Sequence, residues 1–359
     1  MASPLISVIL PSYNHADFVT EAVESVLNQT MRDIELIVVD DGSTDGTPDI
    51  VEKIHDPRLK LIRLEQNRLK HPRNLGLARA KGQYVAFQNS DDVWLPQKLE
   101  LQLKVMQEQR DVVACFTGVE VVDKDGKKKT DSWAAGAYTI KNRSNLQWLQ
   151  HFFTDGNFLC ITSAMVRASS LTQAGKFRES LVQSSDLDLW IRLAGLGQFH
   201  IVDERLTLFR DTTDSQTHSG NLSSPSIRTK NRLRMEYASL LINYTLPPVV
   251  DLLPQVFPDN IPAEPNSKNI WLAYLAKHSW SQYTVYHALF ADGVLSKILD
   301  DETARREITD EFGAEIIQEF IKRRSELSIN FSEKDMSPEH RIKKLLRTIE
   351  RRIERFIRY

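Results

Sequence analysis

The sequence predicts an α/β fold with a mostly parallel sheet flanked by helices, followed by a helical C-terminal region. Two patterns support this prediction. Short apolar runs such as ISVIL (residues 6–10) and IELIVVD (residues 34–40) are of the kind that parallel sheets bury on both faces. Between them, apolar residues recur at helical spacing, as in FVTEAVESVL (residues 18–27). Strands that alternate with helices in this way form mostly parallel sheets.

The expected elements follow in order along the first half of the chain. Strands are expected at residues 6–10, 34–40, 59–64, 84–88 and 111–116. Helices are expected at residues 18–27, 48–54 and 72–82, the last closing on a glycine. An apolar stripe through Leu189 and Trp190 predicts a further helix, and residues 199–210 predict a strand. Aromatic residues on apolar stripes are usually core residues, so we interpret Trp190 as buried rather than as a platform for a sugar.

A different pattern begins near residue 226. Residues 226–244 predict a helix, and six prolines between Pro247 and Pro265 predict an extended, semi-rigid connection. Helices are expected again around residues 271–289 and 303–321. The predicted domains are an α/β domain at 1–224, a helical appendage at 225–335 with its proline-rich connection at 247–265, and a C-terminal helix at 336–359.

Bulk composition narrows the class of protein. The 359 residues carry a net charge of -2, which gives no global reason to expect a nucleic-acid partner. The two cysteines, Cys115 and Cys160, lie in apolar runs, and we interpret them as buried thiols. No signal-peptide pattern opens the sequence, and no apolar run is long enough to span a bilayer. We therefore expect a cytoplasmic protein that is soluble or peripheral to a membrane.

Polar residues follow three of the predicted strands. They occupy residues 11–14, 40–45 and 89–92. Because ligands of parallel sheets bind beyond the carboxyl ends of the strands, we expect the three groups to converge on one crevice. Taken alone, the acids of DGSTDG are typical of a capped turn. Two separate acid clusters at the same edge of the sheet favour a functional site instead.

Carboxylates without a glycine-rich phosphate loop indicate a metal-dependent diphosphate site. The chain has no GxxxxGK[ST] sequence and no GxGxxG after its first strand. A hard cation, Mn²⁺ or Mg²⁺, is the other common means of holding diphosphate oxygens. Such an ion acts as a Lewis acid that neutralises charge on a departing diphosphate.

Four blocks of the sequence resemble the signature blocks of family 2 glycosyltransferases, in the family's order. They are SVILPSYNHADFVTEAVESVLNQT, ELIVVDDGSTDGT, RNLGLARAKGQYVAFQNSDDVWLPQKL and SSDLDLWIRLA, within residues 7–210. The resemblance implies a GT-A (Rossmann-like) fold and a nucleotide-sugar donor, most often a UDP-sugar. It also implies a divalent metal and transfer with inversion at the anomeric carbon, in a protein of bacterial surface-polysaccharide type.

The resemblance assigns donor-side roles by position. Pro11 and Tyr13 would shape the base pocket, Asp41 would read the base or ribose, and Arg73 would contact the nucleotide or orient its acids. The residues assigned to nucleotide-sugar binding are Pro11, Tyr13, Asn14, Asp41, Arg73, Asn89, Ser90 and Asp92. The alternatives are a packed loop aromatic for Tyr13 and a solvated helix residue for Arg73.

The resemblance also assigns the metal and the general base. Asp91 matches the metal-binding acid of the DxD motif, whose first position is Asn89 here instead of the commoner aspartate. Asp186 matches the general base, and Asp188 is the alternative base or a structural acid at the start of a helix. His218 follows the strand at 199–210 later than the family's histidine does, and we assign it as a metal ligand. The alternative for His218 is a solvated loop residue.

The C-terminal segment has a strong charge pattern. Residues 341–359 contain eight basic and two acidic residues, a net charge of +6, around apolar residues that recur at three and four positions. A basic amphipathic helix of this kind predicts binding to an anionic membrane surface. The alternative is a helix docked on its own domain or on a partner.

These assignments predict an inverting, metal-dependent glycosyltransferase that acts on a saccharide or a lipid-linked saccharide acceptor. Two alternatives stay open. Asn89 and Ser185, which replaces the family's commoner glutamate before the base, are also compatible with a catalytically impaired protein that binds sugar nucleotides or acts as a scaffold. A nucleotidyltransferase also combines acids and Mg²⁺ on such a sheet, but it would carry a glycine- and lysine-rich phosphate loop near its N-terminus.

Overall fold

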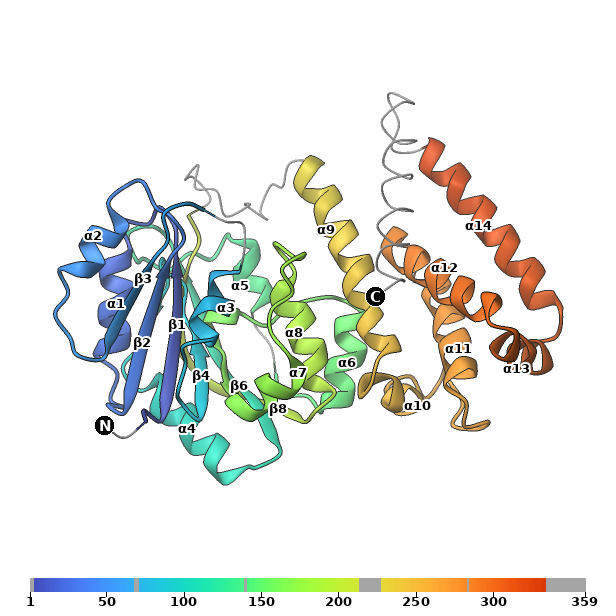
Figure 1. Cartoon of the computed structure of the whole chain (residues 1–359), viewed down its shortest axis with the longest axis horizontal. Coiled ribbons are helices and arrows are strands. Elements are labelled where there is room, and N and C mark those ends of the chain that lie inside the picture. Colours follow the sequence, from blue (N-terminus) through green and yellow to red (C-terminus); the bar gives the residue numbers. More distant parts are fainter. Residues whose placement is uncertain (1–2, 68–70, 139–140, 213–226, 283, 334–359) are drawn as a thin grey trace. The chain divides into compact units, whose positions relative to one another are not determined.

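The computed structural model of the chain describes residues 3–67, 71–138, 141–212, 227–282 and 284–333. These residues belong to two units, Met1–Glu236 and Tyr237–Tyr359. A sheet covered by helices forms the first unit, and helices form the described part of the second (Figure 1). The predicted division at residue 224 falls outside the described residues and stays a prediction.

An eight-stranded sheet forms the centre of the first unit, in the order β3-β2-β1-β4-β7-β6-β8-β5. Its strands are β1 (Ile6–Ser12), β2 (Ile34–Asp40), β3 (Leu59–Arg63), β4 (Tyr84–Phe87), β5 (Val93–Trp94), β6 (Val112–Val122), β7 (Met165–Arg167) and β8 (Gln198–Arg210). β1 runs parallel to β2 and β4, β2 to β3, and β6 to β8. The antiparallel strand β7 joins the two parallel groups, and β5 pairs antiparallel with β8.

Helices pack on both faces of this sheet. They are α1 (Val19–Leu27), α2 (Thr47–Glu52), α3 (Pro72–Leu77), α4 (Lys98–Glu108), α5 (Trp133–Ala137), α6 (Asn145–Thr154), α7 (Ala168–Ala174) and α8 (Ser185–Ala194). Alternate residues of β1, such as Val8 and Leu10, share a buried cluster with residues of α1 and α4. Ile9 meets α3 at Gly76, where a Cβ would lie only 2.5 Å from the Ile9 Cγ2. Burial on both faces explains the unbroken apolar runs of β1 and β2.

The predicted sheet class is confirmed, but the predicted extent of one helix is wrong. We expected the helix at 72–82 to close on Gly82, whereas α3 ends at Leu77 and is capped by Ala78. Gly82 has a different role. A Cβ at this position would lie 2.5 Å from the backbone nitrogen of Ser7, so the glycine lets the chain pass close to β1 before it enters β4.

The second unit consists of helices over its described residues. α9 (Ile227–Leu240) runs across the division between the units, and α10 (Leu253–Val256), α11 (Lys268–Ser281), α12 (Val285–Asp300), α13 (Glu302–Phe312) and α14 (Glu315–Glu333) follow. The range 271–289, predicted to be helical, covers parts of α11 and α12. None of the helices in the described ranges combines the length and the apolar character needed to traverse a bilayer.

The prediction of an extended proline-rich connection is wrong. Residues 247–265 contain the 3-10 turn Val249–Leu252 and the helix α10, in which Pro254 occupies the first turn. Proline is compatible with the first turn of a helix because the amide that it lacks has no partner there. Leu253 and Phe257 are fully buried, so this segment supplies core residues to the second unit.

Candidate active site

The loops that follow β1 and β2 are tied together by hydrogen bonds. Asn14, with a φ of +52°, accepts a hydrogen bond from the Thr44 backbone N–H at 2.9 Å through its Oδ1. The Asn14 backbone N–H donates to Ser43 Oγ at 2.9 Å. Asp40 is fully buried and accepts hydrogen bonds from Ser12 Oγ at 2.9 Å and from Ser43 Oγ at 2.6 Å. Asp40 therefore supports the turn that follows β2 and ties it to the end of β1.

The residues assigned to the base pocket lie at these strand ends. Pro11 is part of β1, opposite Val39 of β2, and Tyr13 follows the strand directly with a partly exposed side chain. Asp41 follows β2 and is 7% exposed. The structure thus brings Pro11, Tyr13 and Asp41 to neighbouring strand ends, as predicted, while their contacts with a nucleotide stay predictions.

The end of β4 brings three more of the assigned residues together. The Asn89 amide donates to Asp92 Oδ2 at 3.0 Å and accepts a hydrogen bond from Arg73 Nη2 at 2.7 Å. Ser90 is 3% exposed, and its Oγ lies 2.7 Å from Nδ1 of His15, a residue of the loop after β1. Asn89 therefore connects α3 with the acidic turn, and Ser90 connects that turn with the first loop.

Arg210 holds the acidic turn from the end of β8. Its backbone N–H donates to Asp92 Oδ1 at 2.8 Å, and its Nε donates to the carbonyl oxygen of Asp91 at 2.9 Å. Its Nη2 forms an ion pair with Glu21 of α1 at 2.6 Å. The sequence places Arg210 at the end of a predicted strand, where the family often has an arginine, and assigns no contact to it. Its side chain is 3% exposed, so its role here is to fix the backbone that carries the two aspartates.

Asp91 and Asp92 have different surroundings. Asp92 is 1% exposed, and both of its oxygens accept hydrogen bonds from the protein. Burial and the negative charge of Asp91 raise the pKa of Asp92 well above the usual range. Asp91 is partly exposed. Burial raises its pKa, and the positive charges of His15, Arg210 and Arg73 oppose this effect. Asp91 is therefore the acid of this pair that is available to a ligand.

The cation that the family implies fits Asp91 as a single protein carboxylate. Within the described residues, the side chain of Asp91 takes no hydrogen bond from another side chain, and three or more metal-binding side chains do not gather anywhere. Mg²⁺ and Mn²⁺ in phosphate sites are commonly held by one or two carboxylates together with substrate oxygens and water. His218, the second predicted ligand, lies outside the described residues.

Arg73 interacts with both the acidic turn and the predicted base. Burial lowers the pKa of its guanidinium group, and three carboxylates oppose this through their negative charges: Asp186, Asp91 and Asp92. Its Nε is buried and has no hydrogen-bond partner among the described residues. A buried guanidinium donor without a partner is costly in an empty protein and suits an anionic ligand.

Asp186 lies in the first turn of α8, as predicted. Its Oδ1 accepts the Leu187 backbone N–H at 2.8 Å, and its Oδ2 accepts the side-chain amide of Asn157 at 2.8 Å. Burial raises the pKa of Asp186 to about 6, against the opposing effects of the Leu187 N–H, Arg73 and Asn157. A carboxylate whose pKa lies just below neutral is ionised at pH 7 and is basic enough to accept a proton.

Asp188 is structural. It is fully buried and forms ion pairs with Arg178 Nη1 at 3.2 Å and with Arg192 Nη2 at 2.7 Å. These contacts connect α8 with the segment that precedes it. Trp190 is also fully buried and packs edge-on against Phe116 with 5.0 Å between ring centroids, which confirms its predicted place in the core.

The segment that leads into α8 is held by a carboxylate that the sequence analysis missed. Glu236 of α9 is 5% exposed, and it accepts the backbone N–H groups of Val182, Gln183 and Ser184 at 2.9, 2.9 and 2.8 Å. Three consecutive N–H donors to one carboxylate fix the chain just before Asp186. The only sequence signal was an acidic residue on a predicted helix, which carries no such information.

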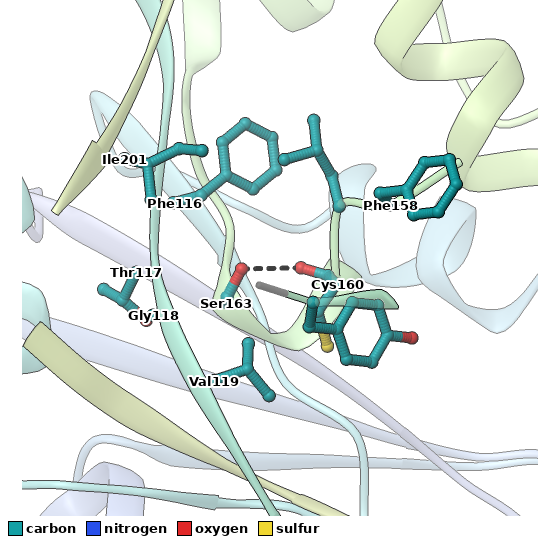
Figure 2. A pocket seen from close by; sticks show the side chains of 10 residues that line it. Phe116, Thr117, Gly118, Val119, Phe158, Cys160, Ser163 and Ile201 are labelled. Carbon is teal, nitrogen blue, oxygen red and sulfur yellow. Dashed lines mark hydrogen bonds between the residues drawn. The ribbon is translucent and has the colours of Figure 1, made fainter. Parts of the chain in front are cut away.

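A small cavity is lined by residues that interact electrostatically with the predicted base, and Figure 2 shows its lining. Phe116, Phe158 and Ile201 supply most of its apolar lining, and the Ser163 hydroxyl donates to the Cys160 carbonyl beside it at 2.7 Å. Tyr138 and Cys160, which also line it, both feel the charge of Asp186, and burial raises their pKa values well above the usual range. Both cysteines are buried free thiols, as predicted.

Comparison with known proteins places the chain in a family. Residues 7–167 match the family described as glycosyl transferase family 2. An uncharacterized glycosyltransferase of Methanocaldococcus jannaschii is 30% identical over 216 residues, which cover 58% of this chain and 72% of that protein. The chain belongs to glycosyl transferase family 2. A putative teichuronic acid biosynthesis glycosyltransferase of Bacillus subtilis is 47% identical over 126 residues, or 34% of this chain and half of that relative.

The fold of the family 2 chain agrees with that of a solved glycosyltransferase. S. aureus TarS 1-349, in a crystal structure with UDP-GlcNAc, superposes with a TM-score of 0.53 and 20% identity, covering 88% of this chain and 92% of that one. The predicted GT-A fold with a helical C-terminal region is therefore confirmed. At this identity the likeness concerns the fold alone.

Proposed function

We propose that this family 2 chain transfers a sugar from a nucleotide-sugar donor to a hydroxyl group of a saccharide or lipid-linked saccharide, with inversion at the anomeric carbon. In this proposal Asp186 is the general base, and Asp91 binds a divalent cation, Mn²⁺ or Mg²⁺, on the donor diphosphate. His218 remains the predicted second ligand of that cation.

One observation carries the proposal. The guanidinium group of Arg73 interacts electrostatically with Asp186 and with Asp91 and Asp92, although Asp186 lies far along the chain from the other two acids. A displacement at an anomeric carbon needs a base on one face of the sugar and a site for the departing diphosphate on the other. A sugar diphosphate bound along Arg73 would have both.

The residues then divide the chemical step between them. As the acceptor oxygen attacks the anomeric carbon, its proton passes to the carboxylate of Asp186. The bond between that carbon and the diphosphate oxygen breaks, and its electron pair leaves with the diphosphate. Arg73, whose Nε has no partner among the described residues, donates hydrogen bonds to the leaving group. A bound divalent cation would add Lewis-acid stabilisation of the same charge.

Donor and acceptor classes follow from the family and one relative. A UDP-sugar is the family's commonest donor, so we propose it here. The B. subtilis relative is a putative teichuronic acid biosynthesis glycosyltransferase, which supports a saccharide acceptor. The cavity beside Asp186, lined by Phe116, Phe158 and Tyr138, lies where an acceptor could pack an apolar face.

The test is metal-dependent turnover of nucleotide sugars. The full chain is first screened against nucleotide sugars by thermal shift with Mn²⁺ present, because a bound donor stabilises the fold. Transfer or donor hydrolysis is then compared for wild type, Asp91→Ala and Asp186→Ala. We expect both variants to lose activity while they remain folded. Full activity in both variants would refute the site, and the absence of any binding or turnover would favour the impaired or scaffold alternative.

We further propose that the protein is peripheral at the cytoplasmic face of a membrane. The support is the basic, amphipathic sequence of residues 341–359, which lie outside the described residues. Deletion of these residues is expected to abolish binding to vesicles that contain anionic lipid and to leave donor binding intact. Vesicle binding that survives the deletion would exclude this segment as the anchor.

A further inference from the structure

Asp186 has a second polar partner that comes from neither its own helix nor the donor side. Asn157 lies in the segment between α6 and β7, and its Nδ2 donates to Asp186 Oδ2 at 2.8 Å. The other carboxylate oxygen accepts the N–H of Leu187 at 2.8 Å. With one donor on each oxygen, the plane of the carboxylate is fixed, and each oxygen keeps a further lone pair.

The orientation of the Asn157 amide is fixed by the protein. Its Oδ1 accepts the backbone N–H of Leu159 at 3.0 Å. Because a backbone N–H can only donate, the amide oxygen must face Leu159 and the NH₂ group must face Asp186. The asparagine therefore presents a donor to the carboxylate, and it does so from a turn that its own side chain closes.

The segment around Asn157 is anchored at both ends. Gly156, with a φ of +94°, directly follows the end of α6 and donates its N–H to the His151 carbonyl at 3.2 Å. After Asn157 the chain lines the cavity through Phe158 and Cys160, and the Cys160 carbonyl accepts the Ser163 hydroxyl at 2.7 Å (Figure 2). A donor on an anchored segment can restrict the side chain that it contacts.

We propose that Asn157 is a positioning residue for the general base, and that its amide holds the Asp186 carboxylate in the orientation and the ionised form in which it accepts the acceptor's proton. This inference rests on the proposed function of Asp186. It concerns a residue that lies outside the four blocks from which the family was inferred. In the transfer step the proton moves from the acceptor oxygen to Asp186, while Asn157 keeps its own hydrogens.

The other groups that face Asp186 leave room for this role. Arg73 is the positive charge that favours the ionised carboxylate. Tyr138 and Cys160 face it as well, but burial raises their pKa values well above the usual range, so both are neutral near pH 7. Among the described residues, the side-chain amide of Asn157 and the backbone N–H groups of Leu187 and Asp186 are the neutral donors that stabilise the charge of Asp186.

Two substitutions separate positioning of the base from support of the loop. Asn157→Asp has nearly the same shape and can still accept the N–H of Leu159, but it replaces the donor with a carboxylate facing Asp186. Asn157→Ala removes both contacts. If Asn157 positions the base, Asn157→Asp is the more damaging variant. If it only closes the turn, Asn157→Ala is the more damaging and Asn157→Asp is close to wild type.

The measurement is the pH profile of kcat in the full chain, with the KM for the donor recorded beside it. In Asn157→Ala the acid limb of the profile is expected to move up by about one pH unit, and in Asn157→Asp by more. The loss of kcat near pH 6 is then about fivefold in Asn157→Ala and larger in Asn157→Asp, and it is smaller near pH 8.5, with the donor KM nearly unchanged. An acid limb in Asn157→Asp that coincides with that of wild type would overturn the proposal.

A matched control is available in Asn142, which braces backbone in the same manner. Its Nδ2 donates to the Ile201 carbonyl at 2.9 Å and its Oδ1 accepts the Ile201 N–H at 2.6 Å, without contact to Asp186. Asn142→Ala is expected to lower the unfolding temperature without moving the acid limb. A limb that moves equally in Asn142→Ala would show that loosening of the fold suffices, which contradicts the proposal.

A spectroscopic readout separates this inference from the proposed reaction. With aspartate labelled at the carboxyl carbon, the ¹³C signal that disappears in Asp186→Asn is assigned to Asp186. It is expected to titrate near the pKa of about 6 in wild type and about one pH unit higher in Asn157→Ala. An equal pKa of Asp186 in wild type and in Asn157→Ala would refute the role of Asn157, and this measurement needs no known substrate. If the pKa of Asp186 is raised in Asn157→Ala but Asp186→Asn keeps its activity, the effect of Asn157 on Asp186 stands and the proposed role of Asp186 as the base is refuted.

Discussion

Two pairs of acids in the first unit look alike in the sequence and divide in the same way in the structure. At the end of β4, Asp92 is buried and bonded by Arg210 and Asn89, whereas Asp91 is partly exposed. At the start of α8, Asp188 is buried between two arginines, whereas Asp186 receives only neutral donors in its hydrogen bonds.

The comparison shows that the spacing of acidic residues in the sequence does not by itself assign a role to each acid. Residues one or two positions apart project in different directions from a turn or a helix. In each pair, one carboxylate is buried and is bonded by the elements that it connects, and the other is partly exposed. Both partly exposed acids interact electrostatically with Arg73, as Asp92 also does. The first type maintains the fold, and we propose that the second carries out the chemistry.

The largest expected effects come from replacing, one at a time, the two acids at the start of α8. Asp186→Asn keeps the size of the side chain and removes the base, so kcat is expected to fall about 10³-fold. The free energy of unfolding is expected to stay close to that of wild type. Asp188→Ala leaves Arg178 and Arg192 without their buried carboxylate, and it is expected to destabilise the first unit by about 3–5 kcal/mol. Urea unfolding and steady-state kinetics on the same preparations measure both effects.

The contrast between these two variants is the control. At a temperature where Asp188→Ala remains folded, its kcat is expected to lie within about tenfold of wild type. A stable but inactive Asp188→Ala, together with an active Asp186→Asn, would reverse the assignment and make Asp188 the base.

A smaller effect is expected at the other pair, where Asn89 occupies the position at which the family usually has an aspartate. Its amide bonds Arg73 and Asp92, so it influences Asp91 through its neighbours. Asn89→Asp adds a negative charge close to the proposed cation. We expect the Mn²⁺ concentration for half-maximal activity to fall about three- to tenfold.

Asn89→Ala is the control for this substitution, because it removes both hydrogen bonds of Asn89 without adding charge. It is expected to lower activity without reducing the Mn²⁺ requirement. An unchanged or higher requirement in Asn89→Asp would mean that Asn89 serves the contact between Arg73 and Asp92 rather than the cation.

The sequence predicted the β-strand scaffold and the place of the acids better than it predicted their partners. The strand at Ile34–Asp40 was predicted with its observed bounds, and Asp186 was predicted at the start of its helix, because apolar periodicity and capping are local signals. Arg210, Asn157 and Glu236 act on these acids from segments far along the chain. No local pattern marks such contacts, since they depend on how the strands are ordered in the sheet.

The two wrong predictions also result from contacts between distant segments. The proline-rich segment has no helical periodicity, yet Leu253 and Phe257 are buried in the second unit, and that packing holds short helical turns together. Gly82 was read as the end of a helix, although its close approach to Ser7 is what requires a glycine. In both cases tertiary contacts outweigh local preference.

Lys98 is a charged group that lacks the kind of partner found in either acid pair. It is fully buried, its Nζ donates to Gln102 Oε1 at 2.9 Å and lies 3.9 Å from the centre of the Trp94 ring, and none of the described carboxylates forms an ion pair with it. Burial lowers its pKa to about 7. Between that value and its usual pKa of about 10.4, the unfolded chain binds a proton that the folded chain has released, so this group makes stability rise with pH.

The smallest expected effect therefore comes from Lys98→Met, which keeps the length of the side chain and removes the charge. At pH 7 the variant is expected to be more stable by roughly 1 kcal/mol, since the lost penalty of burying a charge exceeds the cost of leaving Gln102 Oε1 without a donor. That advantage is expected to shrink as the pH rises and to vanish or reverse above about pH 10.4, the usual lysine pKa, where the wild-type lysine is mostly neutral in both states. Urea unfolding followed by tryptophan fluorescence at several pH values measures the difference, with the exposed Lys53→Met as the control that keeps the wild-type pH dependence. A constant difference between Lys98→Met and wild type from pH 7 to pH 10 would show that Lys98 keeps its charge when buried, and that a buried charge in this fold needs no carboxylate partner.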